Sequence, residues 1–416
     1  MMTASLCIFE DRQYATLLPI TALRPVWDIR CGIFSLREKI ERAYPGAKIR
    51  LNCRTSLAPL VQEEHPERPV NALPNGPCLF LNGRILADTG IATRIPLAGP
   101  DTVFTHGPLI VAVRASGDTL RAITQDENGL IDFSGISSLP QTETACTLVQ
   151  YPWDIVNANG RWITADATAF EGITSRTEGA LIYNGAHLLN PAAITIGRGS
   201  SVKPGVVLDA ENGPIIIGTN VRILPHAVIE GPAYIGHGSV IRIGAKIYEN
   251  TSIGPVCKVG GEVEGCVLHG FANKQHDGFL GHSYLCPWVN LGADTNNSDL
   301  KNNYSSVRVT IDGKEIDSGS LFAGLIMGDH AKSGINTMFN TGTVVGVGSN
   351  VFGAGFPPKY VPAFSWGGSG GMETYDIEKC LAVARKVMQR RNQTLTSTAE
   401  SAMRHLFALT ANERGR

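Results

Sequence analysis

An aliphatic side chain recurs at every sixth position through the middle of the chain. Counting in sixes from Ile217 to Val259 gives an unbroken ladder of eight β-branched aliphatic residues. Ile, Val and Leu together make up about a fifth of ordinary sequence, so chance would produce such a run on the order of once in 10⁵ trials or less. An amphipathic helix repeats its apolar face every three or four residues and an alternating strand every two, so a period of six excludes both. The ladder predicts a parallel β-helix in which three six-residue faces form one triangular turn.

The same step of six extends the expected coil in both directions. In such a coil each ladder residue points inward and stacks on its equivalent one turn away, at a spacing of about 4.8 Å. Additional residues around Glu211–Gly213 shift the phase of the ladder. We therefore expect the β-helix to span residues 194–355. The flanking ladder sets are Ile196, Val202 and Leu208 on one side and Met327, Ser333, Phe339, Val345 and Val351 on the other.

A polar segment interrupts the ladder between Val263 and Phe322 and contains His269, His276 and His282. Insertions in repeat proteins form loops on one face and often carry the function. An imidazole with a pKa near 6.5 can act as a general base at neutral pH, whereas a set of histidines, including histidines from neighbouring subunits, can hold zinc. No acidic general-base pattern accompanies these histidines, which favours acid–base over zinc chemistry.

The run HDGFLGHSYLCPWVNLGADT resembles the acetyltransferase segment of the bifunctional family that joins N-acetylglucosamine-1-phosphate uridylyltransferase to glucosamine-1-phosphate acetyltransferase. In that family a histidine opens the segment and a VNIGAGT-like run follows at the same distance. The resemblance implies a left-handed coil, a homotrimer with sites where subunits meet, acetyl-CoA as cosubstrate and His276 as the general base. His269 and His282 stay open as alternatives for that role.

The same resemblance assigns contacts to the acceptor and to the coenzyme. Acyl transfer to an amino sugar requires that the ammonium group lose a proton before it attacks the thioester, and an arginine can bind the sugar phosphate through two hydrogen bonds. The run VIRIGAK resembles the family's RLRPGAE and places Arg242 at that phosphate. The expected acceptor contacts are Arg242, Lys258, Asn290, Lys301 and Tyr304, and the expected coenzyme contacts are Ala293, Asp329 and Gly346.

Strand-like runs alternate with a helical run over the first 165 residues. SLCIFE, AKIRLN, PCLFLNG and LIVAV surround LREKIERAY, a pattern that predicts an α/β domain. TLLPITALRPVWDIRCGIFSLREKIE resembles the start of sugar-1-phosphate nucleotidylyltransferases, which implies a Rossmann-like domain that takes a nucleoside triphosphate and a sugar phosphate. Where that family has a Gly-rich phosphate loop this chain has IFEDRQYAT, and where it has a metal-binding aspartate this chain has Arg84.

Polar residues near this altered loop form the candidate nucleotide site. YPWDIVNANG resembles a PWDLLEAN run of archaeal bifunctional proteins and places Asp154 as a ligand of Mg²⁺. The layout of RPVxDIRxGI near the start and PWDI before the coil resembles a group of sugar nucleotidyltransferases that share the altered loop. The candidate nucleotide contacts are Arg24, Arg30, Arg37, Lys39 and Asn82.

These patterns divide the chain into four parts. We expect a nucleotidyltransferase-like domain at 1–170, a linker at 171–193, the acyltransferase-like β-helix at 194–355, and a loop with a C-terminal helix at 356–416. The last part begins with the Pro- and Gly-rich run FPPKYVPAFSWGGSGG and continues into DIEKCLAVARKVMQRR, which has helical spacing. Such a tail can cover the open end of the coil.

Composition excludes several classes of partner. Lys+Arg 36 against Asp+Glu 37 leaves a net charge of −1, so the chain lacks the basic field that nucleic-acid binding requires. No run of 18 or more apolar residues occurs, and the start lacks the pattern of a signal peptide, so we expect a cytoplasmic protein without membrane contact. The nine cysteines form no C-x-x-C pair and are expected to be reduced packing residues.

Three functional hypotheses follow from these patterns. The first is a bifunctional sugar-1-phosphate nucleotidylyltransferase and acyl-CoA acetyltransferase that acts on an amino-sugar phosphate in nucleotide-sugar synthesis. The second is a nucleotidylyltransferase alone, with the coil serving assembly. The third is a trimeric protein that binds sugar nucleotides without catalysis.

Overall fold

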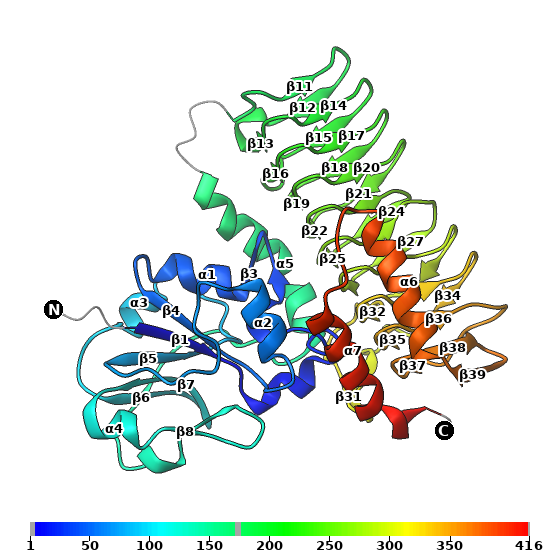
Figure 1. Cartoon of the computed structure of the whole chain (residues 1–416). Helices are drawn as coiled ribbons and strands as arrows, with labels where there is room; N and C mark the ends of the chain where they lie inside the picture. Colours follow the sequence, from blue (N-terminus) through cyan, green and yellow to red (C-terminus); the bar gives the residue numbers. More distant parts are fainter. Residues whose placement is uncertain (1–4, 171–175, 415–416) are drawn as a thin grey trace.

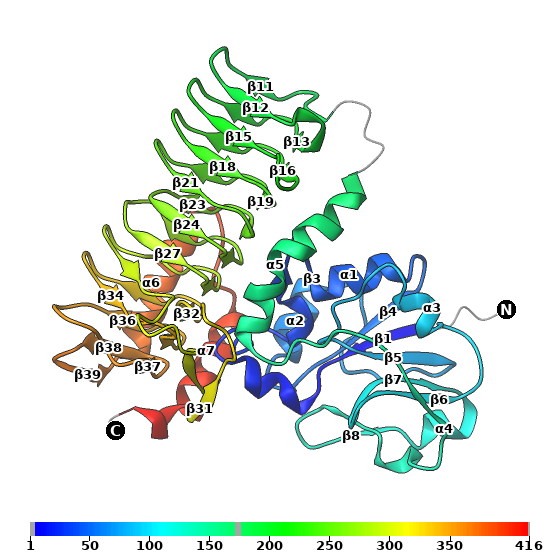
Figure 2. The same ribbon diagram turned by 180° about the vertical axis from the view of Figure 1, so that it is seen from behind.

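The computed structural model describes residues 5–170 and 176–414. An α/β domain and a long coil of short strands lie side by side, and the C-terminal helices lie against the coil (Figures 1 and 2). The expected fold class is confirmed: an α/β nucleotidyltransferase-like domain, then a parallel β-helix, then a helical tail. Among the described residues, every helix is too short or too polar to span a bilayer.

The N-terminal domain is built on a six-stranded mixed sheet in the order β10-β6-β7-β5-β1-β4. The runs expected as strands are strands, and the expected helix is α1. Helix α1 begins at Ser35, whose side chain accepts from the backbone N–H of Glu38 while the Glu38 carboxylate accepts from that of Ser35. The sheet strands are β1 (Ser5–Phe9), β4 (Lys48–Asn52), β5 (Cys78–Asn82), β6 (Thr102–His106), β7 (Leu109–Ala115) and β10 (Gln141–Glu143). The domain's helices and hairpins are β2 (Arg30–Cys31), β3 (Phe34–Ser35), α1 (Leu36–Ala43), α2 (Ala58–Glu64), α3 (Ile91–Arg94), α4 (Gly117–Arg121), β8 (Thr124–Gln125), β9 (Ile131–Asp132) and α5 (Pro152–Ala167).

The coil has three faces, each a parallel sheet whose strands come from successive turns. Face 1 comprises β11 (Leu181–Ile182), β14 (Ser201–Val202), β17 (Arg222–Ile223), β20 (Val240–Ile241), β23 (Lys258–Val259) and β26 (Asn273–Lys274), and continues through β33 (Lys332–Ser333), β36 (Asn350–Val351), β38 (Ser365–Gly368) and β39 (Gly371–Thr374). Face 2 comprises β12 (His187–Leu189), β15 (Val207–Asp209), β18 (Val228–Glu230), β21 (Lys246–Ile247), β24 (Glu262–Glu264) and β27 (Phe279–Gly281), with β29 (Asn296–Asn297) and β34 (Met338–Phe339) beyond them. Face 3 comprises β13 (Ile194–Ile196), β16 (Ile215–Ile217), β19 (Ala233–Ile235), β22 (Thr251–Ile253), β25 (Val267–Leu268), β28 (Tyr284–Leu285), β32 (Ile326–Met327), β35 (Val344–Val345) and β37 (Tyr360–Val361).

The six-residue ladder forms the core of this coil, as expected. Its eight members are each at most 1% exposed. Consecutive members lie on different faces, and the members from Ile217 to Ile241 each pair with the residue eighteen positions on, as Ile217 does with Ile235 and Ile235 with Ile253. Stacking of identical apolar side chains along the coil axis therefore provides the core that a single turn could not form alone.

The coil continues through most of the segment that breaks the sequence ladder. Strands β24 to β29 keep winding, and only the antiparallel hairpin of β30 (Arg308–Ile311) and β31 (Lys314–Asp317) leaves the coil. The sequence period fails earlier because the turns shorten: Ile253 pairs with Leu268 and Val259 with Lys274, at separations of fifteen residues instead of eighteen. The interruption expected between Val263 and Phe322 is thus a change of turn length followed by a short insertion.

The coil extends into the segments expected as linker and tail. Residues 171–175 of the expected linker lie outside the described residues, but β11 and β12 already belong to the first turn. At the other end, the hairpin of β38 and β39 continues face 1. The expected C-terminal helix is α6 (Ile377–Gln389), and a second helix that the sequence patterns did not indicate, α7 (Ser397–Leu409), packs against α2.

Direct hydrogen bonds join the N-terminal domain to the middle of the coil. The backbone carbonyl of Asp28 is 2.8 Å from Nε2 of His269, and Nδ2 of Asn159 on α5 donates to the backbone carbonyl of Asn250 at 2.7 Å. Arg24 forms an ion pair with Asp329 of the coil, and both side chains are buried. The two bodies are therefore held in one arrangement by polar contacts as well as by packing.

Candidate functional site

The three histidines of the interrupted segment lie at three different corners of the same coil turn. His269 follows β25 on face 3, His276 follows β26 on face 1, and His282 follows β27 on face 2. A single chain cannot bring their imidazoles together around one metal ion, because the triangular cross-section of the coil separates them. The three histidines of one chain therefore do not form a zinc site.

Each histidine has a different environment. His269 is buried at the junction with the N-terminal domain, and burial, with the nearby Arg24 and Arg30, lowers its pKa to about 3. His282 has Nδ1 2.8 Å from the Asp299 carboxylate, and its ring stacks on Phe322. His276 is exposed at its corner. A buried neutral imidazole bonded to a backbone carbonyl is not placed to accept a proton from a substrate, so His276 and His282 are the candidates for a general base.

Outward-facing side chains form a polar row across four consecutive rungs of face 1. Lys258 pairs in register with Asn273, Asn273 with Asn290, and Asn290 with Lys332. The two asparagines are joined by a hydrogen bond from Nδ2 of Asn273 to Oδ1 of Asn290 at 3.1 Å. The side chains point outward because their successors in sequence, such as Lys274 and Leu291, take the inward positions.

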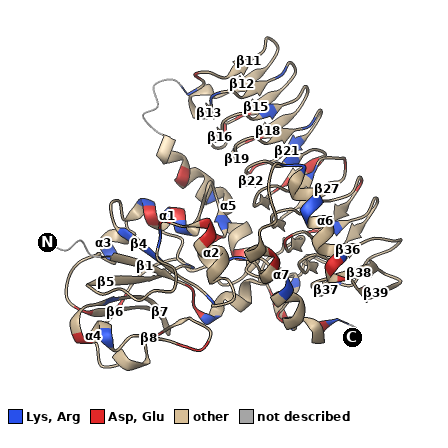
Figure 3. Cartoon of the chain, viewed as in Figure 1, with Lys and Arg blue, Asp and Glu red and all other residues tan. Residues whose placement is uncertain are grey.

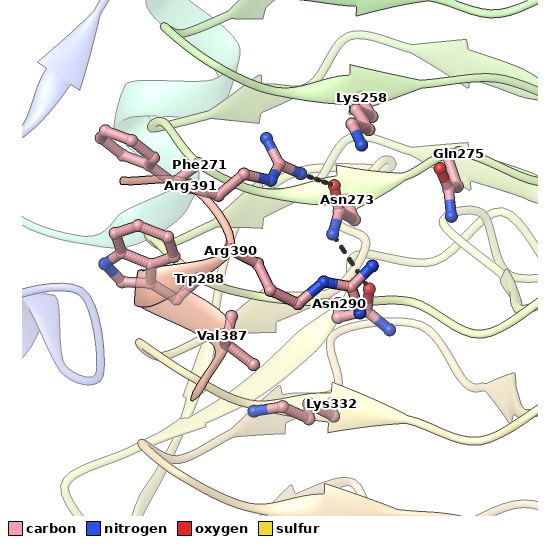
Figure 4. A pocket seen from close by; sticks show the side chains of 10 residues that line it. All are labelled: Lys258, Phe271, Asn273, Gln275, Trp288, Asn290, Lys332, Val387, Arg390 and Arg391. Carbon is pink, nitrogen blue, oxygen red and sulfur yellow. Dashed lines mark hydrogen bonds between the residues drawn. The ribbon is translucent and has the colours of Figure 1, made fainter. Parts of the chain in front are cut away.

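Helix α6 runs over this row and closes it into a cavity of about 320 Å³. Two arginines follow the last turn of α6, and Arg391 donates to the backbone carbonyl of Val256 at 2.8 Å and to Oδ1 of Asn273 at 2.6 Å. Figure 4 shows Arg390 in front of Asn290, between Lys258 above and Lys332 below. The lining residues are Lys258, Phe271, Asn273, Gln275, Trp288, Asn290, Lys332, Val387, Arg390 and Arg391.

The cavity is strongly basic. Its lining includes four cationic side chains and no carboxylate, and basic segments lie on α6 and on the coil beside it (Figure 3). Burial lowers the pKa of Lys258, and repulsion from Arg391 and Arg242 lowers it further. Burial also lowers the pKa of Lys332 and that of Arg391. Cations that depress one another's pKa are stabilised when an anion binds among them.

The structure brings several predicted acyltransfer residues to this place. Lys258 and Asn290 line the cavity, and Arg242 lies in contact range of the neighbouring Gly260 on face 1. His276 lies at the next corner, and the residue after it, Asp277, accepts a backbone hydrogen bond from Asp294 at 3.0 Å. Ala293, the expected coenzyme contact, therefore lies on the turn adjacent to His276.

Other predicted residues of the coil lie elsewhere. Nζ of Lys301 donates to the backbone carbonyl of Ser306 at 2.5 Å, and Tyr304 is an exposed residue of the same loop. Asp329 is buried against Arg24. Gly346 lines a separate cavity of about 780 Å³ between the altered loop, the coil end and α7.

In the N-terminal domain, most of the expected nucleotide contacts are engaged inside the chain. Arg37 bonds Asp28 and Glu41, Lys39 is buried on Asp166, and Arg24 pairs with Asp329. Asn82 donates to Asp11 at 2.8 Å, and Arg30 donates to the backbone carbonyl of His269 at 3.3 Å. These interactions fold the domain and attach it to the coil.

The geometry at Arg84 and Asp154 does not fit a magnesium ion. Arg84 is fully buried and bonds Asp11 through Nε at 2.9 Å and through a terminal nitrogen at 2.6 Å. Oδ2 of Asp154 accepts the backbone N–H groups of Gln150 and Tyr151 at 2.8 and 2.9 Å, so it caps the start of α5. A permanent cation stands where the resemblance placed a metal ligand, and the remaining carboxylate is occupied by helix capping.

A different set of residues could hold a metal ion. Among the described residues, Asp28, Glu64 and His65 place three ligand atoms within 4.8 Å of one another. The Arg37 guanidinium already bonds the Asp28 carboxylate at 2.8 Å, and it offsets the negative charge that would attract a cation.

Sequence patterns missed Asn273, Gln275 and Lys332, which complete the cavity. They belong to turns of fifteen or more residues, so a fixed step of six does not align them with Lys258 and Asn290. The pairing of adjacent rungs reveals them. The two arginines after α6 were visible as a charge pair, but only the tertiary structure brings them to face 1.

Comparisons with known proteins agree with the N-terminal motifs. Residues 6–175 match a family model described as sugar nucleotidyl transferase. A bifunctional sugar-1-phosphate nucleotidylyltransferase/acetyltransferase of Sulfurisphaera tokodaii is 31% identical over 148 residues, which cover 32% of this chain and 37% of that protein. The bifunctional protein GlmU of a Nostoc species is 28% identical over 163 residues, which cover 34% and 35%. The chain thus spans little more than a third of the length of these relatives.

Among solved structures, two UDP-N-acetylglucosamine acyltransferases illustrate the matches. That of Francisella novicida has a TM-score of 0.26 at 16% identity, over 52% of this chain and 73% of that chain. That of Arabidopsis has a TM-score of 0.21 at 12% identity, over 58% and 94%. The family match rests on the sequence comparisons: the model described as sugar nucleotidyl transferase matches residues 6–175, which confirms the resemblance expected from the N-terminal motifs.

Proposed function

We propose that the coil of this protein catalyses acyl transfer from acyl-CoA to an amino-sugar phosphate in nucleotide-sugar synthesis, within the two-part layout of the bifunctional family. The observation that carries the proposal is the basic cavity on face 1, whose cations have no carboxylate among the lining residues and which borders the corner of His276. An anionic acceptor bound there would lie beside the residue that the family resemblance assigns as general base. The proposal includes the homotrimer, with acetyl-CoA as the simplest donor.

The reaction requires one residue that accepts a proton and a group of cations that binds the phosphate. Lys258, Arg242 and the arginines after α6 would hold the phosphate, and the amides of Asn273 and Asn290 would orient the sugar. The imidazole of His276 would take the proton from the acceptor ammonium, and the free amine would attack the thioester carbon. The carbon–sulfur bond breaks as the amide forms and coenzyme A leaves as the thiolate. The nitrogen gives up its second proton in this step, and that proton is taken up by the thiolate.

The N-terminal domain supports a second candidate function. Its family match favours nucleotidylyl transfer, but Arg84 and Asp11 neutralise each other where that reaction needs a metal. Binding of a sugar nucleotide without transfer therefore fits this domain better than catalysis. Release of pyrophosphate from a nucleoside triphosphate and a sugar phosphate would contradict that assignment.

Acyl transfer is tested by thiol release from acetyl-CoA with a panel of amino-sugar phosphates. We expect His276→Ala to lower the rate by about 10²- to 10⁴-fold, the usual contribution of a general base. His226→Ala is the matched control, because His226 is also an exposed histidine at a corner that follows face 1, and it does not line the cavity. It should leave the rate unchanged.

Two outcomes would contradict the proposal. Undiminished thiol release in His276→Ala, with loss in His282→Asn, would transfer the role of base to the pair of His282 and Asp299. Failure of every acyl donor and amino-sugar phosphate to release thiol from the wild-type protein would exclude acyl transfer itself.

A further inference from the structure

Two rows of side chains run in parallel across the turns that form the basic cavity. The polar row ends in Asn273, Asn290 and Lys332 on three successive rungs. Two residues before each of these lies an aromatic side chain: Phe271, Trp288 and His330. Phe271 stacks on Trp288 with ring centroids 4.4 Å apart, and Trp288 stacks on His330 at 6.0 Å. The cavity therefore has an aromatic wall on one side of its polar floor.

The aromatic wall is open to the cavity. Phe271 and Trp288 both line it, on the side opposite Gln275 (Figure 4). A core aromatic residue of a β-helix points inward, as the ladder residue Phe339 does. A stacked pair at the edge of a basic cavity provides a surface on which a planar heterocycle can pack.

The cations extend over more than one phosphate group. Lys258 and Lys332 are three rungs apart, which separates their main chains by about 14 Å at the usual strand spacing. Arg390 and Arg391 reach the space between them from α6. The side chain of Arg390 forms no hydrogen bond or ion pair with the described residues, and the same holds for the side chain of Lys258. Cations at both ends and in the middle suit an elongated anion better than a single phosphate.

The geometry points to a nucleoside diphosphate as the ligand of this cavity, with the base on the wall of Phe271 and Trp288 and the two phosphates between Lys258, Lys332 and the arginines after α6. This inference rests on the proposed function and narrows the substrate class of that site. A nucleotide sugar bound in this way would direct its sugar along the row of Asn273 and Gln275 toward His276. The sugar phosphate of the proposed function would then be the sugar-bearing phosphate of a nucleoside diphosphate sugar, and its amino group would accept the acyl group.

Coenzyme A also contains a nucleoside diphosphate. The ligand of the cavity could therefore be either the nucleotide-sugar acceptor or the coenzyme. Two of the five expected acceptor contacts, Lys258 and Asn290, line the cavity, whereas the three expected coenzyme contacts, Ala293, Asp329 and Gly346, do not. This distribution favours the acceptor. Competition between UDP and coenzyme A for the full chain distinguishes the two sources: displacement assigns the cavity to the coenzyme, and simultaneous binding assigns it to the acceptor.

Calorimetric titration of the full chain tests the inference with four compounds: UDP, ADP, UMP and inorganic pyrophosphate. At least one nucleoside diphosphate should bind tenfold or more tightly than both UMP and pyrophosphate, because only it contacts the wall and the whole row of cations. Arg390→Gln should weaken that binding by about tenfold, the usual effect of losing one charge-assisted contact. Lys386→Gln removes the same charge from the exposed side of α6 and should leave binding unchanged.

A substitution in the aromatic wall distinguishes binding of the base from binding of the phosphates. Phe271→Leu should reduce the affinity for the nucleoside diphosphate toward that for pyrophosphate and leave pyrophosphate binding unchanged. The inference is overturned if neither UDP nor ADP binds to the wild-type protein more tightly than UMP and pyrophosphate do. Equal binding of UDP by wild type and Arg390→Gln would overturn it as well.

These titrations do not depend on turnover. Diphosphate binding with the expected variant pattern, together with no thiol release from any acyl donor, would refute acyl transfer and keep the ligand assignment. Thiol release with amino-sugar monophosphates, together with no preference for diphosphates, would refute the ligand assignment and keep acyl transfer.

Discussion

The charges of the N-terminal domain and those of the coil cavity are organised in opposite ways. In the N-terminal domain Arg84 is bound to Asp11, Lys39 to Asp166, and Arg37 to Asp28 and Glu41. In the cavity on face 1 no carboxylate lies among the cations. A buried cation with a bound carboxylate stabilises a fold, whereas an uncompensated group of cations is stabilised by a ligand. The paired cations of the N-terminal domain therefore stabilise the fold, whereas the cations of the cavity are available to bind a ligand.

Removal of a paired cation should have the largest effect. Arg84→Met removes the hydrogen bonds of Arg84 to the Asp11 carboxylate and to the backbone carbonyl of Val149 and leaves Asp11 without its cation, and we expect a loss of about 3 to 5 kcal/mol in the free energy of unfolding. Urea denaturation measures it. Arg12→Met is the control, because Arg12 pairs with Asp126 at the surface and its side chain is 80% exposed; it should cost below about 1 kcal/mol. A loss of unfolding free energy in Arg84→Met as small as that in Arg12→Met would contradict a structural role for the paired cations.

Lys274 is a third kind of cation, because it is buried inside the coil. It occupies the inward position that follows Val259, and its Nζ donates to the backbone carbonyl of His276 at 2.5 Å. Burial lowers its pKa to about 8 from an ordinary value of 10.5. The unfolded chain therefore binds more protons than the folded chain between these values, and this group makes stability rise with pH there.

The measurement is the stability of wild type relative to Lys274→Met. Wild type should gain up to roughly 3 kcal/mol on the variant as the pH rises from 8 to 10.5. The corresponding difference for Lys246→Met, at an exposed position of the same coil, should not change with pH. A flat difference for Lys274→Met would mean that this lysine is not a buried charge.

His269 tests the junction between the two regions. Burial lowers its pKa to about 3, well below that of a histidine in an unfolded chain, so folding opposes its protonation. Its contribution is fully present above pH 6.5 and is lost as the pH falls below that value, by roughly 2 kcal/mol at pH 5. Denaturation at pH 8 and pH 5 should show a smaller acid loss in His269→Asn than in wild type, and an unchanged loss in the surface variant His237→Asn.

Removal of an unpaired cation should have the smallest effect on folding. Arg390→Gln should change the free energy of unfolding by at most about 0.5 kcal/mol, and at low salt the change should be stabilising because repulsion with Arg391 and Lys258 is relieved. Thermal unfolding at low and high salt measures it, with Lys386→Gln as the matched variant. A loss comparable to that of Arg84→Met would show that the cavity cations are structural.

Sequence patterns predicted the architecture well because apolar periodicity is a local signal. The ladder from Ile217 to Val259 indicated the coil, and the alternating runs around LREKIERAY indicated the α/β domain. Helix α7 was missed because no motif indicated it, although Thr396 caps its start. The extent of the coil between Val263 and Phe322 was underestimated because shorter turns change the residue spacing without ending the winding.

The candidate site was predictable in part. Lys258, Asn290 and His276 were named from spacing and resemblance, and they lie at or beside the cavity. Their roles stay predictions. Lys332 and Arg390 reach the same place from distant parts of the chain, by the return of the coil after the hairpin and by the path of α6. No local sequence pattern predicts that Lys332 and Arg390 lie in the same cavity.

The sequence by itself determined the coil, its apolar core and the resemblance of the N-terminal domain to sugar nucleotidyltransferases, because each depends on the order of nearby residues. The tertiary structure alone decided which cations are free to bind a ligand. Arg24 and Asp329 are 305 positions apart and neutralise each other, whereas Lys258 and Arg391 are brought together with no carboxylate lining the cavity around them. Charge pairing depends on distance in space, so identical residue types act as structure in one region and are available for recognition in the other.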